Sequence, residues 1–229
     1  MKTVIITGAN GNLGMAVTET FLKNGYQVIA TVMTESDKKN MLVHEQLEVH
    51  ALDLTNEQEV SSFVQTIIKE KQQVHAALML AGGFALGNIA ATSGAVLQKQ
   101  FALNFETAYY LARPLFQHML GNGFGRLIFI GARPALQPAD GHNMIAYALS
   151  KSLLFTLAGQ LNEEAKGKNV TATVVVPSTI DTPLNRKNMP DANPANWVTP
   201  CQLADILEFV VSEKGAVLRE PVIKAYNNS

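Results

Sequence analysis

A tyrosine and a lysine in the second half of the chain have the spacing of a catalytic pair. Tyr147 and Lys151 are four residues apart in "YALSK", so on a helix they would share one face, one turn apart. The pKa of a phenol is about 10, and a neighbouring ammonium group favours the phenolate and lowers that pKa. The spacing therefore predicts a general acid, Tyr147, tuned by Lys151. The alternative is a core tyrosine beside a lysine that reaches solvent.

The segment before this pair offers no second hydroxyl group. Between Tyr110 and Tyr147 there is no serine, threonine or tyrosine. Hydride reduction of a ketone creates a localised alkoxide, which two hydroxyl donors would stabilise. A conjugated, nitrogen-rich ring spreads the charge that arrives with the hydride, so one proton donor can suffice. The missing hydroxyl is therefore a clue to the substrate.

A glycine-rich turn near the start of the chain is typical of nucleotide binding. The stretch "TGANGNLG" (7–14) follows a predicted strand and opens a predicted helix. Glycines permit a tight turn and a close approach of the backbone to a pyrophosphate, which the helix N-terminus then binds. The expected cofactor contacts in this turn are Gly8, Asn10, Gly11, Asn12, Leu13 and Gly14.

The sequence leaves the choice between NADH and NADPH open. An acid should end the second strand if the adenosine ribose carries a free 2′-hydroxyl. Thr31, Val32 and Met33 stand there instead. Lys38 and Lys39 either reach a 2′-phosphate or belong to a solvated helix face.

Asp53 ends the third predicted strand in "ALDLT". It either binds the adenine amino group, with Leu54 beside it in the cofactor site, or caps the helix that starts near Asn56. Both interpretations stand on the sequence alone.

Strand-like and helix-like segments alternate along the whole chain. Buried strands are predicted at 3–8, 26–31, 74–82, 125–132 and 170–177, with a strand nearer an edge at 47–53. Helices are predicted at about 12–24, 35–45, 56–71, 95–120, 143–166 and 200–212. This alternation predicts an α/β fold of the Rossmann type: one domain over 1–229, doubly wound, with about seven parallel strands and helices on both faces.

Two of the predicted helices are apolar around more than one face. The helices at 95–120 and 143–166 must therefore be buried on several sides, one against the sheet and one against a second subunit. A homodimer or homotetramer is expected. Pro114 should kink the first of these helices or end its first half.

Composition narrows the class of protein. The chain has 229 residues, a net charge of −1 and one cysteine, Cys201. The charge argues against a nucleic acid or an acidic membrane as partner, and the single cysteine suits a reducing compartment. There is no signal peptide, no apolar run long enough for a membrane span and no metal-ligand spacing among the five histidines. We expect a cytoplasmic protein that acts on a small molecule.

Together these residues resemble the short-chain dehydrogenase/reductase family over nearly the whole chain. The motifs are the glycine turn, Asp53, "LAGG" (80–83), Asn104, Tyr147-x-x-x-Lys151, and Pro177 followed by Thr182. Two details depart from the family pattern: Asn12 stands where many members have a glycine, and "LAGG" lacks the asparagine that usually begins this segment.

The resemblance implies an NAD(P)-dependent oxidoreductase. It implies that Lys151 also holds the nicotinamide ribose, and that Asn104 orders a water relay to Lys151. The further cofactor contacts that it implies are Ala81, Gly82, Gly83, Pro177, Thr179 and Thr182. Asn104 can alternatively be a buried asparagine bonded to backbone, and Asp181 with Thr182 can be a helix cap before Pro183.

Within this family the chain is most similar to the dihydropteridine reductase branch. The stretches "GGFALGN" (82–88), "GARPAL" (131–136) and "PSTIDTPLNRKNMPDA" (177–192), with Trp197 after them, carry this likeness. That branch reduces quinonoid dihydropterin with a reduced nicotinamide and lacks the family's serine, near whose position Ala132 stands here. The implied substrate contacts are Phe84, Ala132 and Asn185, with 185–200 as a substrate lid. Phe84 would stack on the pterin or pack in the core, and the lid segment would otherwise be a disordered connector.

Two other functions stay open. A short-chain carbonyl reductase or alcohol dehydrogenase for another substrate is supported by Asn104 and opposed by Ala132. A non-catalytic NAD(P)-binding sensor is supported by the missing serine and opposed by Tyr147 and Lys151.

Overall fold

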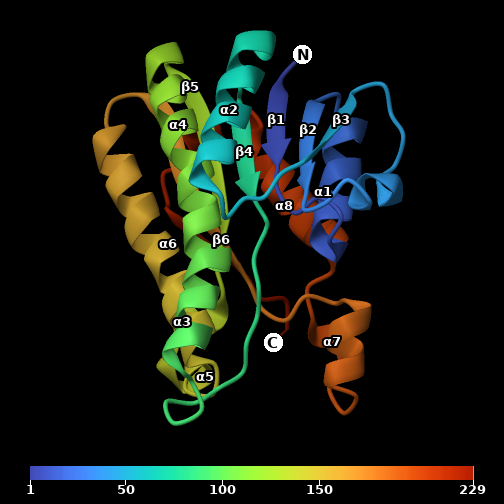
Figure 1. Cartoon of the computed structure of the whole chain (residues 1–229), viewed down its shortest axis with the longest axis vertical. Helices are drawn as coiled ribbons and strands as arrows, with labels where there is room; N and C mark the ends of the chain where they lie inside the picture. Colours follow the sequence, from blue (N-terminus) through green and yellow to red (C-terminus); the bar gives the residue numbers. More distant parts are fainter. Residues whose placement is uncertain (229) are drawn as a thin grey trace.

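A seven-stranded parallel sheet forms the centre of the protein, as the sequence predicts. The computed structural model describes residues 1–228 (Figure 1). The strand order is β3-β2-β1-β4-β5-β6-β7, and each neighbouring pair is parallel. The strands are β1 (Thr3–Ile6), β2 (Gln27–Val32), β3 (Leu47–Ala51), β4 (Ala76–Met79), β5 (Phe124–Ile130), β6 (Asn169–Pro177) and β7 (Val222–Ala225). The chain builds outward from β1 in one direction and then returns through β4 to build in the other. Such a reversal opens a ligand crevice at the carboxyl ends of the strands.

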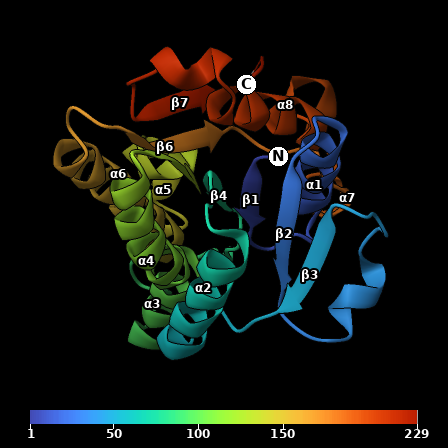
Figure 2. The same ribbon diagram turned by 90° about the horizontal axis from the view of Figure 1, so that it is seen from above.

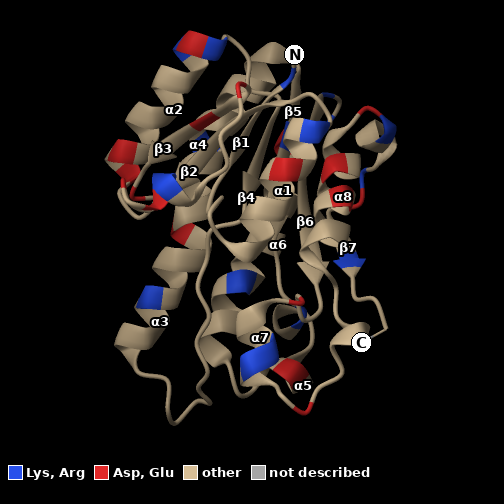
Figure 3. Cartoon of the chain, turned by 90° about the vertical axis from the view of Figure 1, so that its right-hand side faces the viewer, with Lys and Arg blue, Asp and Glu red and all other residues tan. Residues whose placement is uncertain are grey.

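Helices cover both faces of this sheet (Figure 2). One face carries α2 (Glu57–Lys71), α4 (Thr107–Asn122) and α6 (Ile145–Glu164), and the other carries α1 (Asn12–Lys23) and α8 (Pro200–Val211). Shorter elements lie at the edges and loops: η1 (Asp37–Asn40), α3 (Gly94–Phe101), η2 (Ala102–Glu106), η3 (Arg133–Ala135), α5 (Pro138–Gly141), α7 (Pro183–Asn188), η4 (Pro194–Asn196) and η5 (Lys214–Val217). Charges of both signs are scattered over the face drawn in Figure 3.

Burial on both faces explains the continuous apolar strands. All four residues of β1 are buried; Ile5 packs under α2, α4 and α6, while Val4 and Ile6 pack under α1 and α8. By contrast, β3 has only intermediate burial and lies at the edge, which confirms its weaker sequence signal. The strand β7, at the opposite edge, is not predicted by the sequence analysis.

Two predicted helices are wrong in detail. The segment 35–45 contains only the short 3₁₀ helix η1. The Asp37 carboxylate accepts hydrogen bonds from the backbone and the hydroxyl of Thr34, at 3.0 and 2.6 Å. Such local bonds compete with helix formation.

The segment 95–120 is also not one helix. It divides into α3, the wider π-helical segment η2 and α4, and α4 continues through Pro114 to Asn122. The helix therefore departs from α-geometry around Asn104, not at the proline. Such π segments are frequent at functional sites.

Asn162 of α6 substitutes for a missing strand beside β6. Its side chain bonds to both the N–H and the C=O of Ala172, each at 2.8 Å, because β7 begins to pair only at Val174. Asn162→Ala would leave two buried backbone groups without partners and should lower the free energy of unfolding by about 2–4 kcal/mol. Urea unfolding measures this, with the exposed Gln160→Ala on the same helix as a control that should change it by less than about 0.5 kcal/mol. Equal stability of the two variants would contradict the role of Asn162.

Candidate active site

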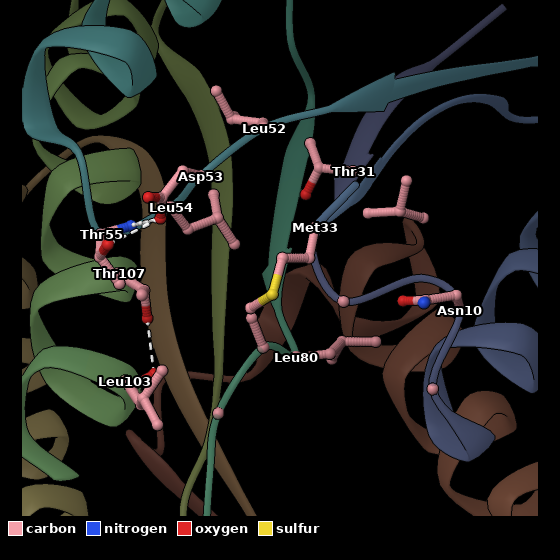
Figure 4. Close-up of a pocket in the computed structure, with 15 residues that line it drawn as sticks. Asn10, Thr31, Met33, Leu52, Asp53, Leu54, Thr55, Leu80, Leu103 and Thr107 are labelled. Atoms are coloured by element: carbon pink, nitrogen blue, oxygen red, sulfur yellow. Dashed lines mark hydrogen bonds between the residues drawn. The ribbon is translucent and has the colours of Figure 1, made fainter. Parts of the chain in front are cut away.

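A pocket of about 280 Å³ lies in the crevice at the carboxyl ends of the strands (Figure 4). In that view Asn10 borders one side, and Asp53, Leu54 and Thr55 border the other. Its lining is Gly8, Asn10, Gly11, Thr31, Val32, Met33, Leu52, Asp53, Leu54, Thr55, Leu80, Ala81, Gly82, Leu103 and Thr107. Seven of the predicted cofactor contacts are therefore brought together here.

The glycine turn is shaped by close backbone contacts. Gly8 has φ +62°, and a Cβ on it would lie 3.0 Å from the Cα of Ala81. A Cβ on Gly14 would lie 2.2 Å from the carbonyl oxygen of Gly8. Asn12, Leu13 and Gly14 open α1, and its N-cap Gly11 contributes no side-chain acceptor. The first-turn amides therefore remain available for an anion, which fits a dinucleotide pyrophosphate.

Asp53 faces this pocket but does not cap α2. Its carboxylate accepts hydrogen bonds from the hydroxyl and the backbone N–H of Thr55, at 2.6 and 2.9 Å, which lower its pKa. Asn56 is the cap, since its side chain accepts from Gln58 and Glu59. The capping alternative is wrong, and the adenine contact stays a prediction.

The end of β2 carries no acid, as the sequence indicates. Thr31 is fully buried, and its hydroxyl has no partner within residues 1–228. Lys38 pairs with Glu35 at 2.8 Å, and neither residue lines the pocket. The residues at the adenosine end of the pocket therefore do not distinguish NADH from NADPH.

Tyr147 and Lys151 share the first turns of α6; Lys151 is buried, and Tyr147 is half-buried. Lys151 is 5% exposed, and its Nζ donates to the carbonyl oxygen of Ile130 at 2.8 Å. The alternative of a lysine that reaches solvent is therefore wrong. Burial lowers the pKa of Lys151 to about 8 and raises the pKa of Tyr147 to about 12. The expectation that Lys151 lowers the pKa of Tyr147 is therefore wrong, because burial raises that pKa.

Asn104 binds the loop that follows β4. Its Oδ1 accepts from the N–H of Gly83 at 2.9 Å, and its Nδ2 donates to the carbonyl oxygen of Gly83 at 3.0 Å. A Cβ on Gly82 would lie 2.6 Å from this Oδ1 and 3.4 Å from the Nζ of Lys151. Asn104 is therefore the buried, backbone-bonded residue of the second interpretation, and it lies beside Lys151.

Phe84 stands at the open side of the site. It is 59% exposed, so the prediction that it packs in the core is wrong. Its ring meets the ring of Tyr147 edge-on, with centroids 5.1 Å apart and planes at 72°. Ala132, which follows β5, is buried and brings no hydroxyl.

The segment after β6 contains two short helices, α7 and η4. Thr182 is the N-cap of α7 and accepts from the N–H of Asn185, while Asp181 forms a two-bond ion pair with Arg186. The Asn185 amide donates to the carbonyl oxygen of Ile180. These contacts confirm the cap and contradict a connector without structure. Pro177, Thr179 and Thr182 do not line the pocket, so their cofactor contacts stay predictions.

Sequence reasoning missed two buried polar residues near the tyrosine. Gln100 and Ser150 both accept hydrogen bonds from Asn104, at 3.0 Å each. The position of Gln100, four residues before Asn104 on a predicted helix, was the available signal. Ser150, next to Lys151, carried no such signal.

Comparisons with known proteins agree with this geometry. Residues 2–193 match the model of the short chain dehydrogenase family. The 3-oxoacyl-[acyl-carrier-protein] reductase MabA of Mycobacterium tuberculosis is 26% identical over 97% of this chain and 90% of its own length. Dihydropteridine reductase of Dictyostelium discoideum is 27% identical over 90% of this chain and 86% of its own. The structure of ElxO with NADP bound superposes with a TM-score of 0.90 at 20% identity, covering 99% of this chain and 97% of that one.

No helix within residues 1–228 has both the length and the apolar character needed to cross a membrane.

The burial of Lys151 predicts a pH-dependent stability. Its pKa is about 8 in the fold against an ordinary 10.5, so the unfolded chain binds more protons between these values. The unfolding free energy of the wild type, relative to Lys151→Met, should therefore rise by about 2–3 kcal/mol from pH 8 to pH 10.5. Urea unfolding at both pH values measures the difference. The exposed Lys69→Met should show no such trend, and a flat difference for Lys151→Met would contradict its burial.

Proposed function

The chain belongs to the short chain dehydrogenase family, and from this premise we propose that it reduces a quinonoid dihydropterin with NADH or NADPH. Membership of the family establishes an NAD(P)-dependent oxidoreductase. The observation that carries the finer proposal is a single proton donor, Tyr147, beside an exposed aromatic ring, with Ala132 in place of a second hydroxyl. The similarity to the Dictyostelium dihydropteridine reductase supports it.

The chain's own residues account for the proton. A bound reduced nicotinamide would supply the hydride. Burial keeps Tyr147 protonated at neutral pH, so its phenol can donate to a ring nitrogen that becomes basic as the hydride arrives. Lys151, charged below its pKa of about 8, then stabilises the phenolate that is left. The exposed ring of Phe84 offers a flat surface for a pterin at the same place.

The glycine turn and the loop after β4 would hold the cofactor. The first-turn amides of α1 would bind the pyrophosphate, and Asp53 would accept from the adenine amino group. Lys151 has two further N–H groups beyond its bond to Ile130, which suit the ribose hydroxyls. Gly82 and Gly83 would contact the cofactor from the loop after β4, and Asn185 with the 185–200 segment would cover the substrate.

A carbonyl reductase for another substrate is the second candidate. The similarity to MabA, named as a 3-oxoacyl reductase, favours it. A ketone would leave an alkoxide with one hydroxyl donor where two are useful, and Ala132 therefore counts against it. The non-catalytic sensor is a weaker candidate because Tyr147 and Lys151 are both present on one helix, α6.

The proposed chemistry predicts a strong effect at Tyr147. Tyr147→Phe should lower kcat with freshly generated quinonoid dihydropterin by about 10²-fold or more, the range of general acid catalysis. The dissociation constant for NADPH should stay nearly unchanged. Absorbance at the reduced-nicotinamide band, with NADH and NADPH side by side, measures both turnover and cofactor preference.

The same assay separates the candidates. Ala132→Ser restores a hydroxyl and should help a ketone reductase more than a pterin reductase. If the wild type binds NADPH but does not turn over quinonoid dihydropterin, the pterin proposal fails. An unchanged rate in Tyr147→Phe would remove Tyr147 as the acid, and binding without turnover of any carbonyl would leave the sensor.

A homodimer or homotetramer is proposed for the assembly. Two large apolar side chains remain exposed on the helices that the sequence marks as apolar all round: Tyr109 on α4 and Leu149 on α6, 37% and 48% exposed. A second copy would bury them. Sedimentation at micromolar concentration should show that the wild type is at least a dimer. Leu149→Glu should shift the equilibrium toward the monomer. A monomeric wild type would contradict the proposed assembly.

A further inference from the structure

A buried amide pair lies behind the catalytic tyrosine and is not used by the chemistry above. We propose that Gln100 is a positioning residue whose side-chain oxygen orients the amide of Asn104, so that Asn104 holds Gly83 and thereby keeps Phe84 against Tyr147. This inference rests on the proposed role of Tyr147 as proton donor. It adds Gln100 and Ser150 to the residues that determine the rate.

The contacts of this pair are formed in the interior. Gln100 lies on α3 and Asn104 on η2, one turn further along, and they are 3% and 1% exposed. The two N–H groups of the Asn104 amide are shared among three oxygens at 3.0 Å each: the Oε1 of Gln100, the Oγ of Ser150 and the carbonyl oxygen of Gly83. Hydrogen bonds shielded from water in this way are costly to leave unmade.

Both acceptors select one orientation of the Asn104 amide. The Oε1 of Gln100 can only accept, and the hydroxyl of Ser150 gives its proton to the carbonyl oxygen of Tyr147 at 2.8 Å, so its oxygen accepts from Asn104. In this orientation Oδ1 faces the N–H of Gly83 and Nδ2 faces its C=O. A rotation of the Asn104 amide by 180° would set donor against donor and acceptor against acceptor at the backbone of Gly83.

The next residue along the loop is Phe84, whose ring contacts Tyr147. Because most of Phe84 is exposed, core packing does not fix its place, and its backbone must do so. Asn104 forms hydrogen bonds to that backbone at Gly83. The space there is tight, since a Cβ on Gly83 would lie 2.8 Å from a methyl carbon of Leu103. Loss of the amide orientation would therefore release the ring and admit water to Tyr147.

Gln100→Met tests this, since it keeps the side-chain length and removes the acceptor. We expect kcat with quinonoid dihydropterin to fall about tenfold, the effect of losing one buried hydrogen bond. The dissociation constant for NADPH should change less than about threefold, well under the kcat effect. Tm alone would not separate positioning from stability, so a spectroscopic reading is needed.

That reading is the ultraviolet titration of Tyr147, taken as wild type minus Tyr147→Phe, with no substrate present. In Gln100→Met the pKa of Tyr147 should fall from about 12 toward the ordinary value of about 10 as water enters. Lys151, one turn along α6, is retained in each of these variants, and its pKa of about 8 makes it neutral throughout this titration. In a Phe84→Ala background, Gln100→Met should add little to either measurement, because the effect passes through Phe84.

Thr18→Val is the matched control. It removes a fully buried hydroxyl that has no partner within residues 1–228 and should change neither kcat nor the titration. Unchanged kcat and titration in Gln100→Met, or equal changes with and without Phe84, would overturn the proposal. If Gln100→Met does not fold, Ser150→Ala removes the other acceptor and must produce the same two changes. If the pterin substrate is wrong, turnover is absent in the wild type, but the titration still decides the role of Gln100.

Discussion

The site depends on holding a cation in the interior beside a phenol. Within residues 1–228 no carboxylate forms an ion pair with Lys151, and the backbone carbonyl of Ile130 at the end of β5 accepts a hydrogen bond from it. Burying such a charge opposes folding, and the pKa of about 8 records that opposition. The apolar packing of α6 on the sheet has to offset it. Burial also raises the pKa of Tyr147 to about 12, so in the proposed mechanism the same feature of the fold gives a protonated acid and a cation for the phenolate that it leaves.

This arrangement divides the crevice into two kinds of wall. On the cofactor side, glycines bring backbone close to backbone at Gly8, Gly14 and Gly82, where a single added carbon would collide with neighbouring atoms. On the substrate side, an exposed ring stands on a loop held by the amide of Asn104. A rigid backbone suits a pyrophosphate, whose shape is fixed. The exposed ring of Phe84 would instead select a ligand mainly for being flat. The proposed cofactor side of the crevice is therefore formed by backbone, and the proposed substrate side by a side chain.

The sequence predicted the parts of this site that have a regular period or a fixed motif. The apolar strands, the glycine turn and the four-residue spacing of Tyr147 and Lys151 are local patterns, and the structure places them as expected. The failed helix at 35–45 has a local cause, the bonds between Thr34 and Asp37, whereas the failures at the site come from contacts between segments far apart in sequence. Neither the π segment around Asn104 nor the burial of Lys151 can be read from neighbours along the chain, because Gly83 and Ile130 determine them. The same holds for the exposure of Phe84, which looked equally suited to a core.

The bond between Asn162 and β6 also bears on how copies of this chain avoid one another. An uncovered strand edge presents donors and acceptors to any extended segment that meets it, including one from a partly unfolded neighbour. Here the free N–H and C=O of Ala172 are already taken by a side chain from a helix of the same molecule. The amide of Asn162 satisfies the backbone of Ala172, where β7 is too short to reach, and removes that donor and acceptor from pairing with a foreign strand. Resistance to aggregation would then rest in part on one residue remote from the catalytic crevice.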